Sequence, residues 1–82
     1  MTRDKVYAAV FRAAREINVN LPLTEATLIH ADLGFDSLDI VEFQMAVEEH
    51  LPGAVDMVGA FDIGETDTLG TVAERILAGP TR

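Results

Sequence analysis

The sequence predicts a small all-α protein, a bundle of three or four helices with a long loop between the first two major helices. Apolar residues recur at helical spacing in three separate segments. Hydrophobic residues make up 49% of the chain but aromatic residues only 6%, which suits a core built from Leu, Ile, Val and Ala. The length of 82 residues predicts a single domain, residues 1–82. A domain this small is stable only if its few core residues are closely packed.

The first helix is expected from Thr2 or Arg3 to about Asn18. One side of it is apolar, with residues three and four positions apart: Val6, Ala9, Val10, Ala13 and Ile17. Pro22 follows, and because the residue before a proline avoids helical geometry, the helix ends within residues 18–22.

A long connection is expected over residues 21–35. Residues 24–27 can form one short helical turn within it. Four leucines are spaced so that they can enter the core: Leu21, Leu23, Leu28 and Leu33.

The second helix is expected from Ser37 to His50 or Leu51, and Pro52-Gly53 ends it. Leu51 would close its last turn. The face that it turns to the core is Ile40, Phe43, Ala46 and Val47.

Residues 53–67 contain three glycines and carry the weakest pattern, although a short third helix near residues 54–60 is expected. The last helix is expected from Thr68 to Ala78, and Gly79-Pro80 ends it. Its apolar residues are Leu69, Val72, Ala73, Ile76 and Leu77.

Charge is distributed unevenly along the chain, whose net charge is −8. From Glu16 to Glu74, both included, there are thirteen carboxylates and no Lys or Arg. Such a field repels nucleic acid and anionic lipid and attracts basic protein surfaces, so we expect neither nucleic acid nor membrane as a partner. The plainer interpretation is that the acids only keep a small protein soluble.

Little in the sequence predicts chemistry carried by side chains. The chain has no cysteine, which excludes disulfides and thiolate nucleophiles. His30 and His50 lack the spacing of metal ligands or of a catalytic triad, so we expect ordinary loop or helix-end histidines and no metal site. No apolar run is long enough to span a bilayer, and the N-terminus leads directly into an amphipathic pattern, so a cytoplasmic location is expected.

Ser37 is the exception, because it lies at the expected start of the second helix. Serine is a common N-cap, and most such serines only cap. Here Asp36 is an equally good cap, and Asp39 can bond back to it in a capping box. Ser37 would then point outward beside free backbone N–H groups and the positive end of the helix dipole, a position that favours an anionic modification. These residues alone do not distinguish phosphorylation from other modifications.

The run Leu33–Phe43, which contains Gly-Phe-Asp-Ser-Leu-Asp over residues 34–39, resembles the signature of acyl carrier proteins. In that family the serine carries a 4′-phosphopantetheine arm. The resemblance implies that a phosphopantetheinyl transferase modifies Ser37 from CoA with Mg²⁺, and that Asp36 helps the transferase to engage. It further implies a non-catalytic carrier that holds acyl or aminoacyl groups as thioesters in fatty-acid, polyketide or related biosynthesis.

The resemblance also implies a surface on the second helix where acyl- or aminoacyl-transferring and synthase enzymes dock through basic surfaces. Its apolar centre would be Leu38, Val41 and Met45, and its acidic rim Asp39, Glu42, Glu48 and Glu49. The plainer interpretation is that the apolar residues belong to the core and that the acids are only hydrated. Exposed acids steer association and orient partners more than they add affinity. No heptad pattern predicts a dimer, so a monomer is expected.

The sequence departs from the family pattern between Pro52 and Asp67. In the family, an aromatic-acidic-Ile segment usually follows the second helix at once. Phe61-Asp62-Ile63 resembles that segment but lies about ten residues further along the chain. This departure favours a specialised member over the housekeeping fatty-acid subgroup. The alternative function is a small acidic interaction module without a prosthetic group, in which Ser37 only starts a helix or is phosphorylated.

Overall fold

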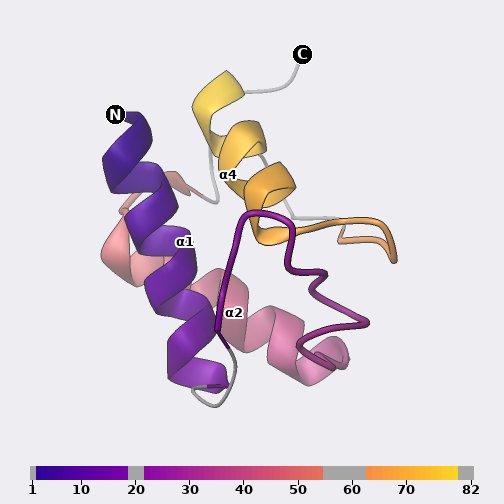
Figure 1. Cartoon of the computed structure of the whole chain (residues 1–82). Helices are drawn as coiled ribbons and strands as arrows, with labels where there is room; N and C mark the ends of the chain where they lie inside the picture. The colour runs from indigo at the N-terminus through magenta and orange to yellow at the C-terminus, as the bar shows by residue number, and fades with distance from the viewer. Residues whose placement is uncertain (1, 19–21, 55–62, 80–82) are drawn as a thin grey trace.

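The structure is a computed structural model that describes residues 2–18, 22–54 and 63–79 (Figure 1). It contains the helices α1 (Arg3–Ile17), α2 (Ser37–His50) and α4 (Leu69–Ala78). The expected all-α bundle and its long loop are confirmed. The stretch 55–62, where a third helix and most of the Phe61-Asp62-Ile63 segment were expected, lies outside the described residues.

Helix α1 packs against both of the other helices, with α2 crossing behind it and α4 beside it (Figure 1). It begins where the Thr2 side chain accepts a hydrogen bond from the backbone N–H of Lys5, at 3.3 Å. It ends at Asn18, whose backbone is extended. Its buried face is Val6, Ala9, Val10, Ala13 and Ala14.

In the described part of the chain, the interior is filled by side chains from α1, α2, α4 and the long loop. Phe43 and Val47 of α2 are fully buried, as the expected core face predicted, and Ile40 is half-buried. Leu69, Val72 and Ile76 supply the face of α4, which begins one residue later than expected because Thr68 is its N-cap. Burial of such apolar side chains is the main stabilising term of a small domain.

The loop over residues 22–36 enters the core, but not through the leucines alone. Leu33 is buried as expected, whereas Leu23 and Leu28 are only half-buried and Leu21 lies outside the described residues. The fully buried side chain is that of Ile29, next to Leu28. Residues 24–27 form the expected turn, closed by a bond from the Thr27 N–H to the Thr24 carbonyl at 3.1 Å.

Backbone hydrogen bonds join this loop to the start of α4. Figure 1 shows the loop running past the first turn of that helix. The Ile29 N–H donates to the Asp67 carbonyl at 3.1 Å, and the Leu69 N–H donates to the Thr27 carbonyl at 3.1 Å. The Gly70 N–H donates to the Glu25 carbonyl at 2.9 Å. The loop therefore has a fixed path to the start of α2, where Ser37 lies.

Candidate functional site

The start of α2 is closed by a reciprocal pair of hydrogen bonds. The Asp39 N–H donates to Asp36 Oδ1 at 2.9 Å, and the Asp36 N–H donates to Asp39 Oδ2 at 3.2 Å. These two bonds form the capping box that the sequence predicted. The N-cap is therefore Asp36, and the cap does not use the Ser37 hydroxyl.

Ser37 is the first residue of α2 and is exposed. The N–H groups of a first helical turn have no intrahelical acceptor, and together with the helix dipole they favour a negative group nearby. A phosphate ester on Ser37 would lie beside these groups without displacing any core side chain. The position therefore fits the phosphate of a phosphopantetheine arm.

The residues before Ser37 fix the point where the chain enters α2. Gly34 has a φ of 69°, a left-handed conformation that favours glycine. It turns the chain so that Phe35 is buried, with its ring 5.9 Å from the ring of Phe43 in α2. The Phe35 N–H also donates to the Ile29 carbonyl at 3.3 Å. The sequence pattern predicts no separate role for Gly34 or Phe35, although both lie within Leu33–Phe43.

An apolar stripe lies on the outer side of α2. Leu38 is 65% exposed, Val41 51% and Met45 66%, so these residues are not part of the core. They are separated from the buried Phe43 and Val47 by the turn of the helix. In the described part of the chain they are the only large apolar residues that are exposed to this degree.

The acids that were expected to surround this stripe differ in their surroundings. Glu42 and Glu49 are exposed, while Asp39 and Glu48 are half-buried. Asp39 takes part in the capping box. Glu48 Oε2 accepts a hydrogen bond from the Gly53 N–H at 2.5 Å, which ties the end of α2 to the following turn. Glu42 and Glu49 are thus the acids best placed to meet a partner.

Each of the two histidines contacts one polar group of the fold. His30 Nε2 lies 3.0 Å from the carbonyl oxygen of Ile63. His50, at the end of α2, pairs with Glu16 near the end of α1. No group of His, Asp and Glu within the described ranges could hold a metal ion.

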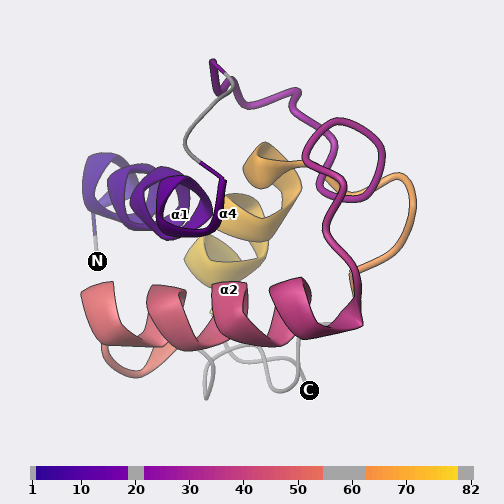
Figure 2. The ribbon, with the colours of Figure 1, turned by 90° about the horizontal axis from the view of Figure 1, so that it is seen from below.

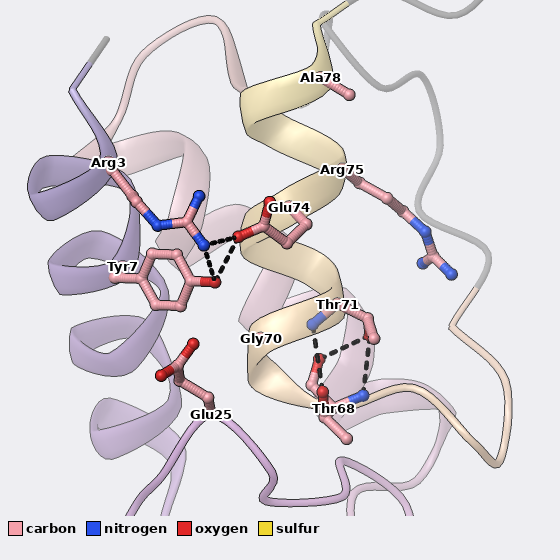
Figure 3. Close-up of a pocket in the computed structure, with 9 residues that line it drawn as sticks. All are labelled: Arg3, Tyr7, Glu25, Thr68, Gly70, Thr71, Glu74, Arg75 and Ala78. Atoms are coloured by element: carbon pink, nitrogen blue, oxygen red, sulfur yellow. Dashed lines mark hydrogen bonds and ion pairs between the residues drawn. The ribbon is translucent and has the colours of Figure 1, made fainter.

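A separate open groove of about 670 Å³ lies between α1, α4 and the loop, and no residue of α2 lines it (Figure 3). The Tyr7 hydroxyl donates to Glu74 Oε2 at 2.5 Å, and Arg3 pairs with the same carboxylate. The bond to Glu74 raises the pKa of Tyr7 to about 12. The bond from Tyr7, together with Arg3, lowers the pKa of Glu74 below its usual value. This network joins α1 to α4 and has no counterpart in the sequence pattern.

Comparison with known proteins connects the bundle to one family. A family model described as a phosphopantetheine attachment site matches residues 10–76, which include all of α2 and the exposed serine at its start. The match covers most of the chain, so the protein belongs to this family of carriers of covalently attached 4′-phosphopantetheine. The resemblance to acyl carrier proteins is confirmed at this level.

No curated protein and no solved structure gives a significant match to the chain. Carrier domains of this family interact with the transferases that modify them and with the synthases that use them. Among the described residues, no helix has both the length and the apolarity needed to cross a bilayer.

Proposed function

We propose that the protein is an acyl carrier protein whose 4′-phosphopantetheine arm is attached to Ser37. The observation that carries this proposal is the division of roles at the start of α2. Asp36 supplies the cap, so Ser37 is exposed and its hydroxyl is not needed to close the helix. Ser37 is also the only serine in the chain.

The bound arm supplies the terminal thiol on which acyl or aminoacyl groups are carried as thioesters. The protein supplies a fixed attachment point, because the buried Phe35 and the capping box hold the first turn of α2 in place. Asp36 has one carboxylate oxygen in the cap bond and is itself exposed. We infer that its negative charge helps a phosphopantetheinyl transferase and its Mg²⁺ to engage Ser37.

Enzymes that load, extend or unload the arm would dock on the outer face of α2. Leu38, Val41 and Met45 form the apolar centre of this docking surface, and their exposure supports the assignment. An exposed patch of this kind, flanked by acids, is typical of an interaction site. Partner enzymes with basic surfaces would be steered to it by Glu42 and Glu49 and would leave it easily, because exposed ion pairs add little affinity.

The pathway that fits is fatty-acid, polyketide or related biosynthesis in the cytoplasm, with the carrier acting as a monomer. The unusual stretch between Pro52 and Asp67 favours a specialised pathway. We infer that the protein is not itself an enzyme, because the reactive group would belong to the arm.

The test is intact-protein mass spectrometry before and after incubation with a broad-specificity phosphopantetheinyl transferase, CoA and Mg²⁺. We expect the mass of one phosphopantetheine to be added to the wild-type chain and none to Ser37→Ala. The control Thr66→Ala removes an exposed hydroxyl from a turn and should be modified like the wild type.

Circular dichroism should show equal helicity in all three proteins, because an exposed first-turn residue contributes little packing. A folded wild-type chain that gains no mass would refute the carrier proposal. It would leave the alternative of a small acidic interaction module in which Ser37 only starts a helix or is phosphorylated.

A further inference from the structure

The basic residues of the described chain fall into two groups. Arg3 pairs with Glu74 and Arg75 pairs with Asp67, so both are used within the fold. The other three are exposed, form no ion pair with any described residue and all belong to α1: Lys5, Arg12 and Arg15. The packing of the bundle gives no reason for these three positive charges.

These three cations lie on one side of α1. At 100° per residue, Lys5, Ala8, Arg12 and Arg15 project within one sector of the helix, away from the buried Val6 and Ala13. Ala8 is small and exposed, so it leaves the surface low between the longer side chains. We call Lys5, Arg12 and Arg15 the α1 basic stripe. At 1.5 Å per residue it extends over about 15 Å of helix.

Two acids lie next to the stripe and offset part of its charge, which leaves this side of α1 with a net positive charge. Glu16 follows Arg15 and lies one helical turn after Arg12, and its carboxylate also pairs with His50 of α2. Asp4 precedes Lys5 in the first turn of α1, where its charge complements the positive end of the helix dipole. Three positive charges therefore face solvent on a protein of net charge −8.

The stripe and the exposed face of α2 belong to different helices. Because α1 and α2 pack against each other, their exposed sides point away from the shared core (Figure 2). The bundle is 20–22 Å across its two shorter dimensions. The screening length at physiological salt is about 8 Å, so a partner on the stripe interacts mainly with the charges of α1 closest to it.

We propose that the α1 basic stripe is a second docking surface and that its partner is an acidic segment of another protein. Nucleic acid is disfavoured because three cations neutralise few phosphates while the whole chain repels a polyanion. A membrane is disfavoured because the stripe has no large apolar side chain to enter the lipid. A short acidic helix or strand with carboxylates over about 15 Å matches the stripe in both charge and length.

This second surface leaves the exposed face of α2 and Ser37 free. A partner could therefore hold the protein by α1 while a different protein uses α2. The proposal does not depend on whether Ser37 is modified, so it can fail while the carrier function stands.

The experiment is a titration of the full chain, labelled with ¹⁵N, with a synthetic 16-residue helical peptide that carries glutamates on one side. We expect saturable amide shifts along the exposed side of α1 and none along α2. Binding should be seen at 50 mM salt and lost at 500 mM, because exposed charges are screened. Arg12→Gln with Arg15→Gln should weaken binding about tenfold, the loss expected for two exposed ion pairs.

The matched control is Ala31→Glu with Thr66→Glu, which changes the net charge by the same amount at exposed loop positions. It should bind the peptide nearly as well as the wild type. Equal weakening in both double variants would show an effect of net charge alone and would overturn the proposal. Shifts centred outside α1 would also overturn it, as would equal or tighter binding of a DNA oligonucleotide or of anionic phosphatidylserine vesicles.

Discussion

At the start of α2, Asp36 closes the helix and Ser37 is left exposed. This arrangement could be predicted from the sequence because capping is local. An Asp at the start of a helical pattern, followed three residues later by a second acid, favours a reciprocal pair of bonds. The burial of Phe35 could not be predicted in the same way, because it depends on the contact of its ring with Phe43 eight residues later.

Asp67 shows what a sequence pattern cannot reveal about a single residue. It is a buried carboxylate at the end of the segment before α4. Its oxygens accept hydrogen bonds from the Gly64 N–H at 2.7 Å, the Arg75 guanidinium at 2.6 Å and the Thr71 hydroxyl at 3.1 Å. In the sequence it is one of fourteen acids, and only the fold brings its three donors together.

Replacing Asp67 should make the free energy of unfolding change less as the pH falls into the acid range. Burial by itself raises the pKa of Asp67, but the bonds from Gly64, Arg75 and Thr71 outweigh it and lower the pKa below the ordinary 3.8. A carboxylate with a lowered pKa stabilises the fold above its unfolded-state pKa, and that contribution is lost as pH falls through the folded-state pKa. We expect Asp67→Asn to lower the free energy of unfolding by about 2 kcal/mol at pH 7.

Urea denaturation of both proteins between pH 7 and pH 2 measures this effect. The difference between wild type and Asp67→Asn should narrow as pH falls below about 4. A difference that stays constant with pH would show that Asp67 contributes through packing and not through its charge.

The bounds of α1, α2 and α4 were predicted within one or two residues because each of these helices has local signals at both ends. Thr2, Asp36 and Thr68 are all N-caps in the structure. The path of the loop was predicted less well. Spacing pointed to Leu28, but the backbone pairing of the loop with the start of α4 turns Ile29 into the core. That pairing joins segments about forty positions apart and leaves no periodic pattern in either.

The contact between the loop and α4 requires a glycine at position 70. A Cβ atom there would lie 2.9 Å from the backbone oxygen of Glu25, which accepts the hydrogen bond of the Gly70 N–H. In an unconstrained helix, Gly→Ala is stabilising by about 1 kcal/mol. Here the added methyl group would force the loop backbone at Glu25 away from α4. We therefore expect Gly70→Ala to destabilise the fold by about 1–3 kcal/mol.

Gly64→Ala is the control for this prediction. A Cβ at position 64 would meet only Asp67 Oδ2, at an ordinary 3.8 Å. Thermal unfolding should therefore show a clear drop in Tm for Gly70→Ala and a much smaller change for Gly64→Ala. Equal Tm values for the two variants would mean that the loop can move away from α4 without cost.

Across the whole molecule, charge is separated by helix. The outer side of α2 combines exposed apolar residues with Glu42 and Glu49, whereas the outer side of α1 carries Lys5, Arg12 and Arg15. The sequence already shows basic residues at its ends and acids between them. Only the fold shows that these charges lie on the outer sides of two helices that pack against each other.

The proposed docking surface on α2 predicts that Glu42→Lys slows modification by a phosphopantetheinyl transferase with a basic surface. Glu42 is exposed beside Val41, so the substitution places a cation where the partner's cations approach. We expect kcat/KM for the transfer of phosphopantetheine to fall about tenfold at low salt, with the loss shrinking as salt is added. Glu65→Lys makes the same charge change in an exposed turn that is not part of α2 and should lower kcat/KM far less. An equal fall in kcat/KM for the two variants would show that net charge governs the encounter. It would contradict the proposal that partner enzymes dock on α2.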